Sequence, residues 1–315
     1  MQGLRIVFLS LISLVLLAAC SSNYAKTQEE NSLAYFETAK GNQVALNTYD
    51  SLKLGIKNSP HYTLATWNIQ HLGQSKTDED MVFMAEVLRD FDIVAIQEVV
   101  AKHPAGAQKV AQLADELNRK GAKWDYRISN PTNSPSVYIS ERYAFLWKTS
   151  KMDLVGRAYL DKDLETQINR EPYIAKFKLK KENQTFFVVN VHSRTYKDQP
   201  ELEIRHFKDY PSRLESNHII LAGDFNLNEQ HAVWDELYQQ GFESAVKNAR
   251  TTLKHTCNSG NYLSHPIDNI YFSKEFSRVS SGVVDYIEHC ENLEAARKIS
   301  DHLPVFLEFN LEANY

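Results

Sequence analysis

Short apolar runs of this chain are repeatedly followed or preceded by a side chain that can bind a cation or carry a proton. Oxygen atoms of carboxylates and amides are hard ligands that suit Mg²⁺ or Ca²⁺. A histidine beside a carboxylate can exchange protons near neutral pH. Because strand ends meet at one rim of an α/β sheet, side chains in this position can share a site. The candidates at the ends of such runs are Asn68, Glu98, His192, Asp224, Asn226 and Asp268.

Each candidate has an ordinary structural explanation when it is taken alone. Glu98 fits a solvated strand end, His192 fits a core histidine, and residues 223–226 fit an Asx turn. Asn68 alone is uninformative. The order of the candidates along the chain, and the residues that accompany them, must therefore carry the argument.

The elements that position these residues follow from apolar periodicity, which predicts a mixed α/β chain over residues 61–315. Long strands, mostly antiparallel, are interleaved with helices. This order predicts one domain in which two packed sheets lie between outer helices. The expected extended segments are residues 62–68, 92–99, 137–148, 173–190 with a turn at 181–184, 218–222, 267–272 and 304–309, and the expected helices are residues 78–89, 104–120, 200–214 and 230–240.

Short motifs occur in a fixed order between residue 62 and the end of the chain. They are Trp67-Asn68-Ile69-Gln70, Gln97-Glu98-Val99, Gly223-Asp224-Phe225-Asn226 and Ser300-Asp301-His302-Leu303-Pro304. Together they resemble the endonuclease/exonuclease/phosphatase family. The deoxyribonuclease I branch of that family is matched further by Glu141-Arg142-Tyr143-Ala144-Phe145-Leu146, Asn169-Arg170-Glu171-Pro172 and His192-Ser193. The resemblance implies an α/β fold, a four-layer sandwich of two mostly antiparallel sheets flanked by helices, and hydrolysis of a phosphodiester bond.

The resemblance implies a divalent-metal centre. It assigns Glu98 as the first metal ligand, with Asn68 beside it and Asp301 as a further ligand. Asp224 is expected to contribute through metal, water or phosphate contacts. Phosphodiester hydrolysis needs an attacking water and neutralisation of charge on the phosphate oxygens, and a divalent cation supports both. The expected cofactor is Mg²⁺, alone or with Ca²⁺ or Mn²⁺.

The resemblance also implies two histidine–carboxylate pairs for proton transfer. It pairs His302 with Asp268 as the general base, and His192 with Glu141 as the general acid near the leaving group. Each carboxylate would hold the tautomer of its histidine and sustain the imidazolium form. Which histidine acts in which direction stays open. The structural alternative for Glu141 is a surface ion pair, and for Asp268 it is a turn before a strand.

Contacts to the phosphate are expected from Arg170, through its planar guanidinium, and from Asn226. The chain departs from deoxyribonuclease I at the residues that enter the minor groove of DNA in that enzyme. Val100, not an arginine, follows residues 97–99, and Tyr138 is one residue out of register with the groove-binding tyrosine. This departure weakens the expectation of minor-groove reading and leaves the hydrolytic centre intact.

The first 19 residues have the pattern of a secretory signal, because their apolar run is too short to span a membrane comfortably. The run ends in Leu-Leu-Ala-Ala before Cys20 and resembles the bacterial lipobox. We therefore expect residues 1–19 to be removed, Cys20 to be lipidated, and residues 20–60 to form a tether and N-terminal extension. Ser21 favours the outer membrane of the bacterial envelope. An ordinary signal with a chance cysteine is the alternative.

The chain is mildly acidic, with a formal net charge of −5 that becomes −6 without residues 1–19, because Arg5 is their only charged residue. Proteins that bind nucleic acid tightly and nonspecifically usually carry a strong basic excess. The charge therefore argues against a tight binding protein more than against an enzyme, which can use a local basic rim for transient capture.

Cys257 and Cys290 are the two cysteines besides Cys20. A disulfide between them can persist in an oxidising envelope compartment, and we expect one there. Two free thiols are the alternative, because spacing alone cannot decide.

The leading function is a divalent-metal-dependent phosphodiester hydrolase, an endonuclease-like nuclease with DNA rather than RNA as its substrate. The expected partners are nucleic acid and, through the lipid on Cys20, the membrane; no protein partner follows from the sequence. A sphingomyelinase-like or inositol-phosphate phosphoesterase would use the same centre, and a non-catalytic binding lipoprotein would keep only the fold. The ionisable residues retained together favour an enzyme, and the segments around Glu141 and Arg170 favour a nuclease.

Overall fold

Alternating and continuous apolar runs build two sheets that face each other. In β15 (Val305–Leu311) every second side chain is buried. In β9 (Ile219–Asp224) all side chains are buried, and in β1 (Tyr62–Leu72) nearly all are buried. A strand that buries both faces must be covered on both sides, so these sheets need outer helices as well as each other. These sheets are seen in a computed structural model of the protein, which describes residues 61–311.

The first sheet has six strands in the order β14-β15-β1-β2-β4-β3. The second has the order β10-β13-β9-β8-β7-β5, and β6 also pairs with β7. Among the strands of residues 61–311, parallel pairing is confined to β1 with β2 and to β8 with β9, so the prediction of mostly antiparallel sheets is confirmed. The remaining strands are β2 (Ile93–Val100), β3 (Trp124–Ile128), β4 (Glu141–Lys148), β5 (Met152–Leu154), β6 (Tyr159–Leu160), β7 (Tyr173–Leu179), β8 (Thr185–His192), β10 (Glu243–Ser244), β13 (Asp268–Phe272) and β14 (Phe276–Val283).

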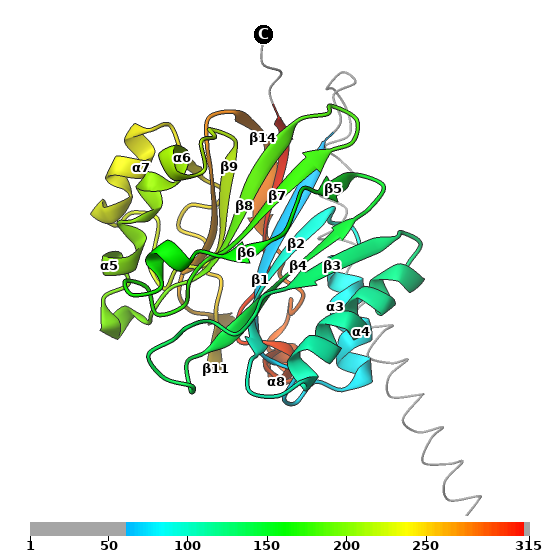
Figure 1. Ribbon diagram of the computed structural model, residues 1–315. Helices are drawn as coiled ribbons and strands as arrows, with labels where there is room; N and C mark the ends of the chain where they lie inside the picture. The colour runs from blue at the N-terminus through cyan, green and yellow to red at the C-terminus, as the bar shows by residue number, and fades with distance from the viewer. Residues whose placement is uncertain (1–60, 312–315) are drawn as a thin grey trace, which may run out of the picture. The chain divides into compact units, whose positions relative to one another are not determined.

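Four layers result from the packing of apolar faces. Side chains of both sheets, among them the fully buried Phe145, Phe186 and Phe309, fill the space between the sheets. The outer face of the first sheet is covered by α3 (Asp78–Leu88) and α4 (Ala105–Arg119), and that of the second by α5 (Glu201–Ile204), α6 (Tyr210–Arg213) and α7 (Asp235–Gln239) (Figure 1). The predicted four-layer α/β sandwich is therefore confirmed.

Two of the predicted helices are wrong as continuous elements. Residues 200–214 form α5, the 3₁₀ turn η3 (Phe207–Asp209) and α6. Pro211 is tolerated in the first turn of α6, but it has no N–H and its ring opposes a helix that arrives from the preceding turn. Residues 230–240 form the 3₁₀ turn η4 (Ala232–Trp234) followed by α7. The extended segment predicted at residues 137–148 begins only at Glu141, where β4 starts. Two further 3₁₀ turns are η1 (Lys162–Leu164) and η2 (Tyr196–Asp198).

A small hairpin stands apart from the two sheets. It consists of β11 (Leu253–Asn258) and β12 (Asn261–Leu263), and it packs against α8 (Leu293–Ile299). Cys257 in β11 is joined by a disulfide to Cys290 in the 3₁₀ turn η5 (Cys290–Asn292). The hairpin is thereby tied to the segment that precedes α8.

The expected signal over residues 1–19, Cys20 and the tether to residue 60 lie outside the described residues. Within residues 61–311, no helix is both long enough and apolar enough to cross a membrane.

Gly223 provides a test of the packing between β8 and β9. Its φ is +153°, and a Cβ atom added there would lie 1.9 Å from the carbonyl oxygen of Val191 in β8. Backbone atoms cannot move aside as a flexible side chain can, so we expect Gly223→Ala to lower the free energy of unfolding by at least about 3 kcal/mol. Urea unfolding measures the loss.

The matched control is Gly156→Ala. Gly156 also has a positive φ, +72°, but an added Cβ would have no heavy atom within 4 Å. This substitution should cost only about 1–2 kcal/mol, the usual strain of a left-handed residue. Equal losses in the two variants would contradict the close approach of the strands at Gly223.

Candidate active site

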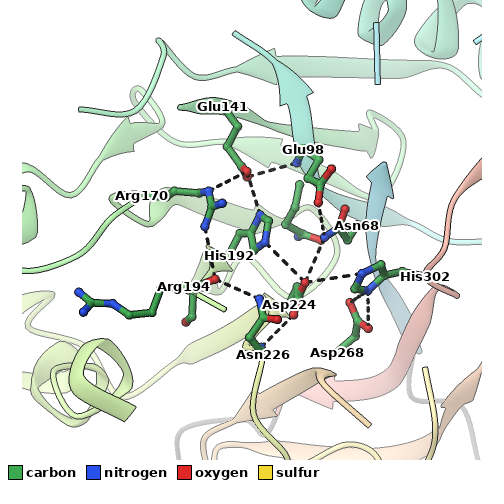
Figure 2. A network of polar contacts seen from close by, with 12 residues as sticks. Asn68, Glu98, Glu141, Arg170, His192, Arg194, Asp224, Asn226, Asp268 and His302 are labelled. Atoms are coloured by element: carbon green, nitrogen blue, oxygen red, sulfur yellow. Dashed lines mark hydrogen bonds and ion pairs between the residues drawn. The ribbon is translucent and has the colours of Figure 1, made fainter. Parts of the chain in front are cut away.

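The residues predicted from the sequence to do chemistry lie together where the two sheets meet (Figure 2). Each sheet contributes part of the set, and most of these polar side chains are buried. The first sheet contributes Asn68 from β1, Glu98 from β2, Glu141 at the start of β4 and His302 just before β15, and the second contributes His192 at the end of β8, Asp224 at the end of β9 and Asp268 at the start of β13.

His192 and Glu141 form one histidine–carboxylate pair, with 2.8 Å between Nδ1 and Oε2. The Arg170 Nε atom lies 3.0 Å from the same oxygen. Burial by itself raises the pKa of Glu141, but His192 and Arg170 lower it below its ordinary value. Burial and Arg170 lower the pKa of His192, whereas Glu141 and Asp224 raise it, and the net direction is upward. The pair therefore favours a carboxylate beside an imidazolium.

His302 and Asp268 form the second pair. Nδ1 of His302 lies 2.9 Å from Oδ2 and 3.0 Å from Oδ1 of Asp268. Asp268 is held on its other side by Thr251, whose hydroxyl donates to Oδ2 at 2.6 Å. Burial alone lowers the pKa of His302, but Asp268 and Asp224 raise it to about 10. In this pair, too, Nδ1 is bound by the carboxylate and Nε2 is the atom that remains for chemistry.

Asp224 lies between the two pairs. Nε2 of His192 is 3.6 Å and Nε2 of His302 is 3.8 Å from the same atom, Asp224 Oδ2 (Figure 2). Nδ2 of Asn68 donates to this oxygen at 3.1 Å. Burial and the neighbouring Asp268 raise the pKa of Asp224. Two imidazoles whose free nitrogen atoms approach one point can act on one reacting group, the first as a base and the second as an acid.

Asn68 and Glu98 offer oxygen atoms to a hard cation. Asn68 donates through Nδ2 to Glu98 Oε1 at 3.1 Å, whereas its own buried Oδ1 has no hydrogen-bond partner among the described residues. A free, buried amide oxygen beside a carboxylate suits Mg²⁺ or Ca²⁺. Glu98 has a φ of +61°, at a point where the pairing of β2 with β4 is irregular. Such a bulge re-aims a side chain, and a glutamate in this conformation is typical of functional sites.

A second group of ligand atoms lies next to the first. One ligand atom from each of Asp224, Asp268 and His302 falls within 4.8 Å of the others, which is consistent with a divalent metal. In this group Nδ1 of His302 is already hydrogen-bonded to Asp268. We regard the oxygen atoms of Asn68 and Glu98 as the better match to Mg²⁺, because imidazole suits transition metals more than it suits magnesium.

The remaining predicted residues surround this centre. The backbone oxygen of Asp301 accepts a hydrogen bond from Leu253 N at 2.8 Å, and the charge of Asp301 contributes to the raised pKa of His302. The carbonyl oxygen of Ser193, which follows His192, accepts two hydrogen bonds. One comes from Arg170 Nη1 at 3.4 Å and the other from Asn226 Nδ2 at 3.1 Å. The structure thus brings the predicted metal, proton-transfer and phosphate residues into one region.

Ser300 and Thr251 hold this region together, although neither is predicted from the sequence as a site residue. The Ser300 hydroxyl donates to the carbonyl oxygen of Asn68 at 2.7 Å and accepts from the backbone N of His302 at 3.1 Å. Its place in the Ser300-Asp301-His302 motif is a signal that could have identified it. Thr251 stands 17 residues before its partner Asp268 and belongs to no recognisable motif.

A cleft of about 680 Å³ opens beside Glu98, Glu141 and Arg170. Its wall includes Tyr138, which is 85% exposed, and the ammonium group of Lys102, which lies 3.8 Å from the centre of the Tyr138 ring. A lysine over a tyrosine ring is a favourable cation–π pair. The cleft therefore presents a positive group and an aromatic face close to the predicted site.

The chain is similar in sequence to one protein family and to named deoxyribonucleases, and in fold to a solved structure. Residues 65–302, which include every predicted site residue from Asn68 to His302, match the model of the Endonuclease/Exonuclease/phosphatase family. A deoxyribonuclease of Thioalkalivibrio sp. (strain K90mix) is 31% identical over 78% of this chain and 70% of its own length. Deoxyribonuclease-1-like 1 of Sus scrofa is 27% identical over 79% of this chain and 81% of its own length. An endonuclease/exonuclease/phosphatase family protein of Bacteroides thetaiotaomicron has a similar fold, with a TM-score of 0.59, 17% identity, and coverage of 81% of this chain and 100% of that one.

The raised pKa of His302 gives a prediction for the metal-free protein. A histidine with a raised pKa keeps its proton as the pH rises through its ordinary value of 6.5 and loses it near the folded value, here about 10. The stability that the protonated pair contributes is therefore fully present below pH 6.5 and is lost as the pH approaches 10. We expect the imidazole NMR signals of His302 to be those of imidazolium at neutral pH.

Asp268→Asn serves as the comparison for this titration. It removes the carboxylate that opposes the effect of burial, so the midpoint of His302 should move to lower pH. A midpoint at the ordinary histidine value in the unchanged protein would show that Asp268 and Asp224 do not govern this imidazole.

Proposed function

Because the chain belongs to the endonuclease/exonuclease/phosphatase family, we propose that it is a divalent-metal-dependent nuclease that hydrolyses phosphodiester bonds of DNA. The observation that carries the proposal is the approach of two imidazole Nε2 atoms to a single oxygen, Asp224 Oδ2, at 3.6 and 3.8 Å. Each imidazole is bound at Nδ1 by its own carboxylate. Hydrolysis of a diester needs one group that accepts a proton and one that donates a proton on either side of the phosphorus, and this arrangement supplies both.

Asn68 and Glu98 would hold the cation, with Asp301 beside them. The donor set of amide and carboxylate oxygen atoms favours Mg²⁺, with Ca²⁺ or Mn²⁺ as alternatives. A divalent cation bound there would neutralise negative charge on the phosphate oxygens.

His302 would act as the general base. Its Nε2 atom accepts the proton of the attacking water, while Asp268 at Nδ1 stabilises the imidazolium that forms. The water oxygen forms the new bond to phosphorus as its proton moves to His302. The imidazole must be neutral before this step, so the rate should rise with pH over the range in which His302 loses its proton.

His192 would act as the general acid. Glu141 favours its protonated form, and Nε2 can pass that proton to the leaving oxygen as the bond from phosphorus to this oxygen breaks. Arg170 and Asn226 stand beside this histidine and would contact the phosphate through N–H donors. The donated proton and the proton taken by His302 balance over one turnover.

DNA is the proposed substrate because the relatives that align over most of this chain are named deoxyribonucleases. The segments around Glu141 and Arg170, which favour this branch in the sequence, lie at the acid end of the site and line its cleft. A phosphoesterase that acts on sphingomyelin or inositol phosphates remains the alternative for the same centre.

We expect the purified protein to nick supercoiled plasmid DNA in the presence of Mg²⁺, and excess EDTA to stop the reaction. His302→Ala and His192→Ala should each lower turnover by roughly 10²- to 10⁴-fold, the usual contribution of a general acid or base. Gel electrophoresis of the plasmid over time measures both effects.

The control for these variants is His289→Ala, which alters an exposed histidine outside the two pairs and should leave the nicking rate unchanged. The same preparations are to be assayed on RNA, sphingomyelin and inositol phosphates. Release of phosphocholine from sphingomyelin with DNA left intact would make the protein a phospholipase. Binding of DNA without hydrolysis of any of these substrates would make it a binding lipoprotein.

We propose further that a lipid on Cys20 anchors the enzyme in the outer membrane of the bacterial envelope. The support is the apolar run over residues 6–19 that ends in Leu-Leu-Ala-Ala directly before Cys20. In a bacterial host, the protein should incorporate labelled palmitate and sediment with outer membranes, and Cys20→Ser should lose both properties. Ser22→Ala, two residues away, should lose neither. Label retained by Cys20→Ser would remove the anchor from the proposal.

A further inference from the structure

The segment over residues 244–267 contains no acidic side chain, although the chain as a whole has 40 acidic and 35 basic residues. It carries Lys247, Arg250 and Lys254 together with His255 and His265. Lys247 lines a separate hollow with Glu229 and Glu243, so its charge has acidic neighbours. The other four basic residues stand on the part of the segment that approaches the site.

Arg250 and Lys254 supply the positive charge of this group, and His255 and His265 add ring N–H donors beside them. Arg250, His255 and His265 are exposed and Lys254 is half-buried, and none of the four has an acidic partner within ion-pair distance among residues 61–311. Many other surface cations are neutralised by an acidic neighbour, as are Arg89, Lys109, Lys120, Lys180, Lys208 and Arg213. An exposed cation without a counter-charge keeps its full attraction for an anion.

Backbone contacts place the segment against the general-base end of the site. Leu253 N donates to the backbone oxygen of Asp301 at 2.8 Å, and Thr252 pairs with His302 in an isolated bridge. Lys254 directly follows Leu253 in the sequence, so its main chain lies one residue from this contact. The other end of the site, at Glu141 and Arg170, lies across Asp224 in Figure 2 and opens into the cleft of Lys102.

The support for Lys254 and His255 is rigid. Both belong to β11, whose Cys257 is joined by the disulfide to Cys290. Nη1 of Arg297 in α8 also donates to the carbonyl oxygen of Leu253 at 2.8 Å. A hairpin held in this way keeps the backbone that carries Lys254 in place, so a bound strand does not have to order that backbone.

We propose that Arg250, Lys254, His255 and His265 form a basic rim that binds the phosphate backbone of double-stranded DNA next to the scissile bond. The inference rests on the proposed nuclease function of the adjoining site. With Lys102 in the cleft at the opposite end, the rim gives the enzyme cations on both sides of the reacting phosphate. The contacts are to phosphates, so they carry no sequence preference.

The double variant Arg250→Gln with Lys254→Gln tests the rim. Binding of a fluorescently labelled short duplex to the full chain is followed by anisotropy in EDTA, which prevents hydrolysis, over a series of KCl concentrations. We expect weaker binding and a plot of log affinity against log salt whose slope is smaller by about 2, since each phosphate-binding cation contributes about 1. An unchanged affinity and slope would refute the rim.

Two control variants separate charge from shape. The swap Arg250→Lys with Lys254→Arg keeps both charges and should keep the slope. Lys123→Gln removes an exposed lysine next to the start of β3 and should also keep the slope. The start of β3 pairs with the last residue of β4, at the other end of that strand from Glu141. If the charge-preserving swap loses the slope as fully as the double glutamine variant does, the segment acts through its shape and the proposal is wrong.

The failure of the rim and the failure of the nuclease proposal give different results. If plasmid DNA is cleaved while the salt slope does not depend on Arg250 and Lys254, the rim is refuted and the nuclease stands. If the slope depends on both residues while no DNA is cleaved, the rim stands and the nuclease assignment is refuted.

Discussion

Hydrogen bonds between buried polar side chains join the two sheets at the end where the site lies, and the rest of the site depends on them. An unpaired polar group in an apolar interior costs about 1–3 kcal/mol, so each partner must stay where the other can reach it. The same contacts therefore set the register of one sheet on the other and the direction of each imidazole. The pairs that cross from sheet to sheet are Glu141 with His192, His302 with Asp268, Asn68 with Asp224, and Gln97 with Asn190.

Asn190 shows how one such contact permits an unusual backbone at Glu98. The ladder between β2 and β4 is irregular between Ile96 and Val99, and Nδ2 of Asn190 donates across the sheets to the carbonyl oxygen atoms of Ile96 at 3.1 Å and Ala144 at 3.2 Å. The second sheet thus satisfies acceptors of the first at the bulge. Glu98 can then keep its left-handed conformation, which strand pairing alone does not support.

Strand ends and the family motifs together predict most of this site, including the pairs of His192 with Glu141 and of His302 with Asp268, and they miss Thr251, which belongs to neither signal. Glu98 and Asp224 follow buried runs and could be identified because the carboxyl ends of strands gather at one rim. Thr251 reaches Asp268 only because the hairpin of β11 and β12 brings the chain back, and no apolar periodicity in the sequence predicts this return. The helix predicted at residues 200–214 fails for a local reason, since Pro211 outweighs the apolar pattern. Lipidation of Cys20 remains a prediction from the sequence.

Net charge is a poor guide to the partner of this chain, because cations differ in whether they are already neutralised. A lysine beside a glutamate contributes to the formal charge, but the glutamate cancels most of its attraction for an anionic ligand. An unpaired lysine keeps that attraction. An acidic chain can therefore attract a polyanion if unpaired cations stand close to its site. Arg250 and Lys254 are free and adjoin the general base, while Arg89 and Lys120 are both paired with Glu86. The formal net charge of the whole chain is therefore a weak argument against a nuclease.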